Sequence, residues 1–237
     1  MSEFAGKVVL VTGAAGNVGS AVAEAFAGLG ADLALFDRAE DRLNALVERL
    51  PGDGRRLIQT PDLLARDAVA ASMDRVASTL GRVDCLANIA GGFTMGPKLH
   101  ETPSSDWDFM MDLNARSVFH ACAAAVPHML ATGGGRIVNV SARAAREGKA
   151  GMGPYCASKA AVITLTETLA AEHKHAGINA NCILPGTVDT PQNREAMPDA
   201  DHATWVAPSA LADVVVFLAS AASRAVSGAA IPVYGRS

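Results

Sequence analysis

The sequence has little charge and no run of basic residues. Asp, Glu, Lys and Arg together make up 19% of the 237 residues, and the formal net charge is −4. A protein that binds nucleic acid or an anionic lipid surface usually presents a basic face or a polybasic segment. We therefore expect neither of these partners, and a small molecule is the expected one.

Long apolar runs are missing as well. No apolar run reaches the roughly 20 residues that a helix needs to cross a bilayer. The opening residues 1–7 include Glu3 and lead directly into a strand pattern, without the basic-then-apolar order of a secretory signal peptide. We expect a cytoplasmic protein that does not enter a membrane.

Cysteine is scarce, and histidine is scattered. The four cysteines are Cys85, Cys122, Cys156 and Cys182. They form no CxxC pair and lie in apolar segments, where a thiol behaves as a small hydrophobic side chain. This usage fits a reducing compartment. His173 and His175 are two residues apart and do not share a helix face, so we expect no metal site.

What the sequence does have is a regular alternation of short β-branched runs and longer Ala- and Leu-rich stretches of helical period. The expected strands are residues 7–12, 33–37, 55–60, 83–88, 136–141, 178–184 and 230–234. Half of the residues are apolar, which suffices for one sizeable core. The pattern predicts one α/β domain over residues 1–237, a Rossmann-type doubly wound parallel sheet flanked by helices on both faces.

Two segments between these elements carry further information. The three glycines of residues 133–135 indicate the end of a helix before the fifth strand. Residues 185–208 form the one long stretch without a regular pattern. A loop of this length in a compact domain is usually functional, and we expect a lid over a site.

A glycine-rich turn follows the first expected strand and precedes a helix expected over residues 17–30. Its residues of interest are Gly13, Gly16, Asn17, Val18 and Gly19. Free backbone N–H groups and the helix dipole at such a turn bind a pyrophosphate, and small residues allow its close approach. The position after the first strand of an alternating chain favours a dinucleotide site over a plain turn.

Asp37 ends the second expected strand, about twenty residues beyond the glycines. A carboxylate there accepts hydrogen bonds from the adenosine ribose diol and repels a 2′-phosphate. Arg38 is the opposing signal, because a guanidinium binds phosphate. No Lys or Arg within residues 13–19 assists it, so we expect NAD(H) to be favoured over NADP(H). The alternative for Asp37 is a cap on the next helix.

Tyr155 and Lys159 are four residues apart in a segment that begins with Pro154, so both side chains lie on one helix face. A phenol with a pKa near 10 is a poor acid or base at neutral pH, and a nearby ammonium favours its anion. On their own, such pairs are common and mostly structural.

Together with the other motifs, the pair resembles the short-chain dehydrogenase/reductase family over nearly the whole chain. The glycine motif TGxxxGxG appears over residues 12–19, with Asn17 in place of the middle glycine. We expect the turn to survive, because Asn tolerates positive φ better than most residues. The YxxxK motif appears over residues 155–159, and the PG loop over residues 185–190.

The resemblance implies roles for individual residues. Tyr155 is the acid or base, Lys159 also holds the nicotinamide ribose, and Asn114 holds a water for proton relay. The implied cofactor contacts include Asp62, Leu63, Asn88, Ala90, Gly91, Pro185, Gly186, Val188 and Thr190. The alternatives from the residues alone are a helix cap for Asp62, support of a turn for Asn88 and a solvated helix position for Asn114.

The catalytic serine is where the chain departs from the family. Family spacing places this serine thirteen residues before the tyrosine, and that position is Ala142. Ser141 is one residue early, and successive side chains of a strand point to opposite faces. Ser141 is the candidate serine, but we expect its hydroxyl to miss the substrate.

Several loop segments are similar to the dihydropteridine reductase branch of the family, which reduces a quinonoid pterin with NADH. They are Ala142, the 90–93 turn, residues 189–194, residues 197–201 and Trp205. Such a substrate is protonated in the course of reduction, so it depends less on a serine that polarises a carbonyl.

The sequence thus predicts an NAD(P)(H)-dependent oxidoreductase that moves hydride between nicotinamide and a small carbonyl or alcohol. The alternatives are a quinonoid dihydropteridine reductase and a non-catalytic dinucleotide sensor, whose one support is the missing serine. Candidate substrate walls are Phe93, Met152, Met197 and Trp205, for which ordinary loop packing is the alternative. By resemblance, we expect a homodimer or homotetramer.

Overall fold

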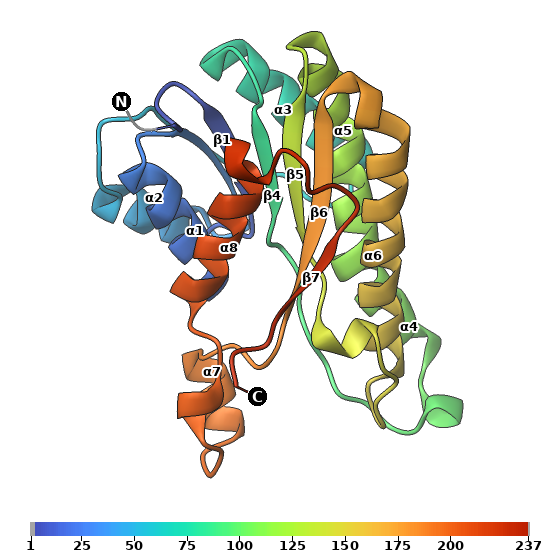
Figure 1. Ribbon diagram of the computed structural model, residues 1–237. Coiled ribbons are helices and arrows are strands. Elements are labelled where there is room, and N and C mark those ends of the chain that lie inside the picture. Colours follow the sequence, from blue (N-terminus) through green and yellow to red (C-terminus); the bar gives the residue numbers. More distant parts are fainter. Residues whose placement is uncertain (1–2, 237) are drawn as a thin grey trace.

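The computed structural model describes residues 3–236 and contains one seven-stranded sheet (Figure 1). Every pair of neighbouring strands is parallel, and the strand order is β3-β2-β1-β4-β5-β6-β7. The strands are β1 Val8–Thr12, β2 Asp32–Phe36, β3 Arg56–Gln59, β4 Cys85–Asn88, β5 Gly135–Val140, β6 Ile178–Pro185 and β7 Ala230–Val233. All seven predicted strands are present, with ends that differ by one or two residues.

Helices cover both faces of this sheet (Figure 1). They are α1 Asn17–Gly28, α2 Glu40–Arg49, α3 Arg66–Leu80, α4 Ser104–Met111, α5 Ser117–Ala131, α6 Gly153–His173, α7 Pro191–Ala196 and α8 Pro208–Ala219. Helices α1, α2 and α8 pack on one face, and α3, α5 and α6 pack on the other. The predicted doubly wound Rossmann-type fold is therefore confirmed.

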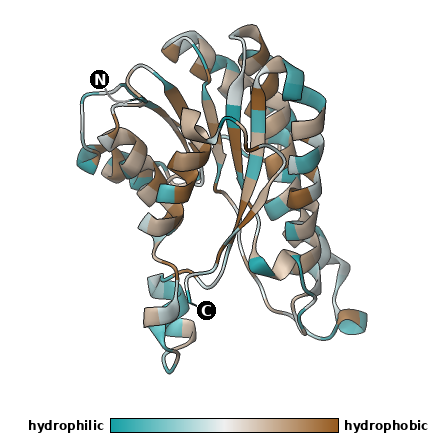
Figure 2. Ribbon diagram, in the orientation of Figure 1, coloured by the Kyte–Doolittle hydropathy of each residue, from teal (hydrophilic) through white to brown (hydrophobic). Residues whose placement is uncertain are grey.

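The strands are apolar on both sides because both sides are covered. In β1, Val9 and Val11 belong to the core beneath α1 and α8, whereas Val8 and Leu10 belong to the core beneath α3 and α5. Figure 2 shows hydrophobic residues along the strands and hydrophilic residues on the outer sides of the helices. In residues 3–236, no helix is both long and apolar enough to cross a membrane.

The predicted helix stop after α5 is confirmed. Gly133 and Gly134 have φ angles of 84° and 135°, a region that favours glycine. A Cβ on Gly134 would lie 2.5 Å from the carbonyl oxygen of Gly177. These glycines let α5 end and β5 begin within a few residues.

Residues 185–208 are more ordered than the sequence suggested, so the prediction of an irregular stretch is wrong in part. The segment contains α7, a 3-10 turn at His202–Thr204 and a parallel bridge between Val188 and Val206. Thr190 caps α7, with Oγ1 accepting from Asn193 N at 3.2 Å, and Pro191 occupies the first turn. This Thr-Pro start signal was available in the sequence.

Strand order reverses at β1, whose neighbours are β2 on one side and β4 on the other. Connections from the carboxyl ends of these strands lead to helices on opposite faces, so a crevice opens between them. Helices α4 and α7 lie at this end of the molecule (Figure 1). The fold therefore directs the search for a site to this edge.

Candidate active site

A cavity of about 1180 Å³ opens at the carboxyl ends of the strands, near the strand-order reversal. Most residues predicted for the cofactor and substrate line it. They are Gly13, Gly16, Asn17, Val18, Gly19, Asp37, Arg38, Asp62, Leu63, Ala90, Gly91, Phe93, Ser141, Met152, Tyr155, Lys159, Pro185, Gly186, Val188, Thr190 and Met197. The fold thus brings together residues that are far apart in the sequence.

Two positions of the glycine loop, Gly13 and Gly19, have no room for a side chain. Gly13 has a φ of +65°, and a Cβ there would lie 2.8 Å from Ala90 Cα. A Cβ on Gly19 would lie 2.0 Å from the carbonyl oxygen of Gly13. Asn17 is the first residue of α1, and no non-glycine residue among those described has a positive φ. The turn survives with Asn17 in place of the middle glycine, as expected, but positive φ at Asn17 is not the reason.

The N-terminus of α1 opens into the same cavity. Gly16 is its cap residue, and no side chain caps this end with a hydrogen bond. The first N–H groups of a helix have no partner within the helix and carry the positive end of its dipole. A loop closed to side chains beside an uncapped helix start fits the pyrophosphate of a dinucleotide.

Asp37 holds the backbone where β2 ends at the cavity. Its Oδ2 accepts from Ala15 N at 3.0 Å and its Oδ1 from Ala39 N at 3.2 Å. The cap residue of α2 is Ala39, so Asp37 does not cap that helix. Each carboxylate oxygen has two lone pairs, which leaves acceptor sites for a ribose diol.

Asp62 and Leu63 lie in the turn after β3. Asp62 Oδ1 accepts from Leu64 N at 3.0 Å, while Ala65 is the cap residue of α3, so Asp62 does not cap this helix. A ring nitrogen of His120 lies 3.0 Å from the carbonyl oxygen of Leu63. His120 thus supports this turn from α5, a role that the sequence did not indicate.

Tyr155 and Lys159 project from the first turns of α6, and burial dominates the electrostatics of both. Lys159 Nζ donates to the carbonyl oxygen of Val140 at 3.0 Å. Burial raises the pKa of Tyr155 to about 12 and lowers the pKa of Lys159 to about 8. The sequence-based expectation that the ammonium lowers the phenol pKa is therefore outweighed by desolvation in the unliganded protein. The raised pKa favours the neutral form of the Tyr155 phenol in the unliganded protein.

The phenol is placed by an aromatic neighbour. The rings of Phe93 and Tyr155 meet edge to face, with centroids 4.9 Å apart. Phe93 itself is half exposed to the cavity, which fits the predicted substrate wall. Met95 and Phe109 are further apolar side chains on this wall that the sequence analysis did not select. Met95 lies in the loop after β4 and Phe109 in α4, so only Met95 carried the signal of a loop at the carboxyl end of a strand.

Asn114 lies in a π-helical turn, Asp112–Arg116, that separates α4 from α5. The side chain is fully buried and does not line the cavity, so the alternative of a solvated helix position is wrong. Oδ1 accepts from Gly92 N at 2.9 Å, and Nδ2 donates to Ser158 Oγ at 3.1 Å. Asn114 thereby ties the turn after β4 to α6.

Ser141 is turned away from the reacting end of the cavity. Its Oγ donates to the backbone carbonyl of Lys159 at 2.7 Å, and the residue is 2% exposed. The hydroxyl is thus engaged in the contact between β5 and α6. Ala142, which follows it, lines the cavity with a methyl group.

Two other predicted residues lie outside the cavity. Asn88 is buried at the end of β4, where its Nδ2 donates to Asn139 Oδ1 at 2.8 Å, so this side chain joins β4 to β5. Asn139 in turn donates to Thr166 Oγ1 at 2.9 Å. Trp205 packs against His202 with ring centroids 4.4 Å apart and planes tilted by 50°, and it does not line the cavity.

No group of three or more His, Cys, Asp or Glu side chains within residues 3–236 is arranged to hold a metal ion. The chemistry that this part of the chain supplies itself is therefore that of a phenol, a buried ammonium and backbone N–H groups. These groups donate protons or hydrogen bonds and stabilise anions.

Known proteins share both the sequence pattern and the fold. A family model described as short chain dehydrogenase matches residues 7–201. D-threitol dehydrogenase of Mycolicibacterium smegmatis is 36% identical over 240 residues, which cover 97% of this chain and 92% of that protein.

Two solved structures extend the comparison to three dimensions. Carveol dehydrogenase from Mycobacterium avium in complex with NAD superposes with a TM-score of 0.91 at 31% identity, covering 99% of this chain and 98% of that one. NAD⁺-bound xylitol dehydrogenase gives 0.90 at 29% identity, covering 98% and 99%.

These findings confirm the family-level resemblance and do not single out the dihydropteridine reductase branch. The chain belongs to the short-chain dehydrogenase/reductase family.

Proposed function

We propose that this oxidoreductase moves hydride between NAD(H) and a small carbonyl or alcohol, with Tyr155 as the acid or base. The observation that carries the proposal is the position of Tyr155 and Lys159 on one face of α6, at the cavity into which the glycine loop opens. Bound nicotinamide supplies or accepts the hydride. The protein supplies binding, orientation and the proton.

Tyr155 and Lys159 have different roles in this proposal. In the direction of reduction, the Tyr155 phenol gives its proton to the substrate oxygen, and in oxidation the phenolate takes it back. Lys159 keeps a positive charge beside the reacting centre, where it stabilises the phenolate that follows proton transfer. Its Nζ is held by the carbonyl oxygen of Val140, so the charge has a fixed position.

The preference for NAD(H) rests on Asp37. Its carboxylate lies where β2 ends and lines the cavity together with Arg38. A second negative charge from a 2′-phosphate would be repelled there, whereas a ribose diol donates hydrogen bonds to it. Two similar structures contain NAD, which supports the same choice.

A second candidate function is the reduction of an activated C=N bond, as in a quinonoid dihydropterin. The observation that favours it is the methyl group of Ala142 at the position of the family's catalytic serine, with Ser141 Oγ occupied by Lys159. A substrate that is protonated during reduction needs fewer donors toward a developing oxyanion than a ketone does.

Replacing Tyr155 with Phe tests the acid/base assignment. We expect turnover to fall about 10²- to 10⁴-fold, because general acid catalysis is lost. NADH affinity, measured by fluorescence titration, should stay within a few-fold, because only a hydroxyl is removed. The matched control is Tyr234→Phe, which removes the other tyrosine hydroxyl and should keep turnover. Parent-like turnover in Tyr155→Phe would contradict the catalytic role and favour a different acid.

Asp37→Asn tests the cofactor preference, because the amide loses the charge. It keeps one acceptor oxygen, so only one of the two hydrogen bonds from Ala15 N and Ala39 N is retained. The ratio of NADPH to NADH dissociation constants should shrink about tenfold, or about 1.4 kcal/mol. The control is Asp41→Asn on the exposed first turn of α2, which should leave the ratio unchanged. Tighter binding of NADPH than NADH by the parent protein would show that Arg38 dominates.

The buried ammonium of Lys159 predicts a pH dependence of stability. Its pKa is 10.5 in the unfolded reference and about 8 in the folded protein. Between these values the unfolded chain binds more protons at this residue, so Lys159 makes a contribution to the free energy of unfolding that rises with pH. The buried thiols of Cys85, Cys122 and Cys182 act in the opposite direction, because burial raises their pKa values. The contribution of Lys159 is therefore read from the difference between variants: the slope of the free energy of unfolding against pH should be more positive in the parent and in Lys174→Met, on an exposed turn, than in Lys159→Met. Urea unfolding of cofactor-free protein from pH 7.5 to 10 measures these slopes. An identical slope in the parent and Lys159→Met would refute the burial argument.

Two single variants test whether Ser141 acts in catalysis and whether Ala142 occupies the position of the family's serine. Ser141→Ala should change turnover little, because its hydroxyl binds a backbone carbonyl. Ala142→Ser should raise ketone reduction by part of the roughly 10²- to 10³-fold that one oxyanion donor contributes. Reduction of a quinonoid dihydropterin should barely change. The measurement is kcat/KM for both substrate types. A collapse of activity in Ser141→Ala without a gain in Ala142→Ser would restore Ser141 as the catalytic serine.

A further inference from the structure

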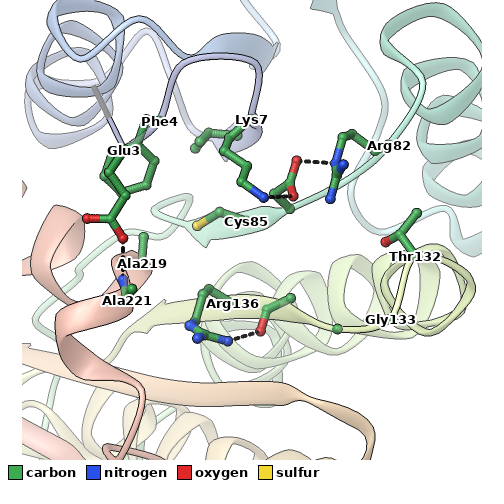
Figure 3. Close-up of a pocket in the computed structure, with 14 residues that line it drawn as sticks. Glu3, Phe4, Lys7, Arg82, Cys85, Thr132, Gly133, Arg136, Ala219 and Ala221 are labelled. Atoms are coloured by element: carbon green, nitrogen blue, oxygen red, sulfur yellow. Dashed lines mark hydrogen bonds and ion pairs between the residues drawn. The ribbon is translucent and has the colours of Figure 1, made fainter. Parts of the chain in front are cut away.

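A second cavity, of about 300 Å³, lies at the end of the sheet where the strands begin (Figure 3). Four segments enclose it: residues 3–9 at the N-terminal side, residues 82–85 before and within β4, residues 132–136 between α5 and β5, and residues 219–221 after α8. Among the described residues, none lines both this cavity and the cofactor cavity. The two cavities occupy opposite ends of the sheet.

The wall of this cavity carries more positive than negative side chains. Lys7, Arg82 and Arg136 are the cations, and Glu3 and Asp84 are the carboxylates. Asp84 is fully engaged: it lies 3.2 Å from Lys7 Nζ and 2.6 Å from Arg82 Nε, and it accepts from Val8 N at 2.9 Å. Lys7 and Arg82 thereby share one carboxylate on one side of the cavity.

Arg136 is the third cation of the wall, and it does not pair with Asp84. Figure 3 shows it across the cavity from Lys7 and Arg82. Its guanidinium donates to the carbonyl oxygens of Gly135 at 3.1 Å and Gly177 at 3.5 Å, and within residues 3–236 it forms no ion pair. Its Nε is buried and has no hydrogen-bond acceptor among those residues. A buried donor without an acceptor is destabilising, and a water molecule would satisfy the donor but not the charge.

Arg82 adds a second incompletely satisfied donor. Its Nε is also buried, and its 2.6 Å contact with Asp84 is an ion pair that lacks the geometry of a hydrogen bond. The other carboxylate, Glu3, accepts from the backbone N–H of Ala221 on a different wall (Figure 3). The arrangement therefore offers an anion one unpaired guanidinium and a second, partly satisfied one.

We propose that this cavity binds a small monocarboxylate with an apolar body. The planar guanidinium of Arg136 matches a carboxylate in geometry and charge. Two carboxylates in the wall disfavour a dianion such as phosphate. Phe4, Cys85 and Ala219 supply an apolar surface for the body of the ligand. The volume lies at the lower end of the range for small-molecule sites, about 300–1,000 Å³. The site is independent of the proposed redox function.

Benzoate is a suitable probe because it combines one carboxylate with a small apolar ring. Isothermal titration of the full chain should detect one benzoate per chain, with the same affinity in the presence of saturating NADH. R136Q should weaken binding at least tenfold, since a charge-assisted hydrogen bond is lost. The control is R75Q, which also removes one positive charge but lies on the exposed face of α3, outside the cavity. It should bind benzoate with the affinity of the parent.

A second variant tests the cavity without changing its charge and covers the case in which R136Q does not fold. A219M fills the space beside the apolar wall and should abolish benzoate binding, whereas A222M on the exposed turn after α8 should not. Any of four results would overturn the proposal: no benzoate binding to the parent at millimolar concentration, equal affinity in R136Q, retained binding in A219M, or competition by NADH. Arg136-dependent binding of inorganic phosphate without binding of benzoate would also reject a monocarboxylate.

Discussion

Lys159 carries its ammonium into the interior between β5 and α6, and much of the catalytic end depends on how that charge is held. Nζ donates to the carbonyl of Val140, while the backbone carbonyl of the same lysine accepts from Ser141 Oγ. These two bonds fix α6 against the end of β5 and so place Tyr155, one turn earlier, at the cavity. The residue that faces the lysine is a glycine, Gly91. A Cβ at this position would lie 3.0 Å from Lys159 Nζ.

A buried chain of side-chain amides holds the strands beneath this lysine. Asn88 in β4 and Asn139 in β5 are partners, and Asn139 reaches Thr166 in α6. Asn114 makes the equivalent connection from the π-turn to Gly92 and Ser158. Buried amides with satisfied hydrogen bonds specify one arrangement of the elements they join. The catalytic helix is therefore located by polar contacts as well as by apolar packing.

The fold was largely readable from the sequence, because alternating patterns report burial on both sheet faces and glycines report turns. The glycine loop and the Tyr155–Lys159 pair were readable for the same reason: spacing fixes which residues share a face. The role of a side chain could not be read from the sequence where it depends on a partner far away in the chain. Asn88 donates to Asn139 of the neighbouring strand, and Trp205 packs against His202 and does not line the cavity. No local sequence pattern indicates such partners. Burial raises the pKa of Tyr155 and lowers the pKa of Lys159, and the extent of burial is known only from the folded structure.

The hydrogen bond from Asn17 Nδ2 to Gln192 Oε1, 2.8 Å long, links the glycine loop to α7. Both residues line the cavity, so this bond joins the lining that α1 contributes to the lining that α7 contributes. An exposed hydrogen bond of this kind contributes about 1 kcal/mol. Two segments whose bonded residues are 175 apart in the sequence are thus coupled at the rim of one cavity through a single contact that solvent reaches.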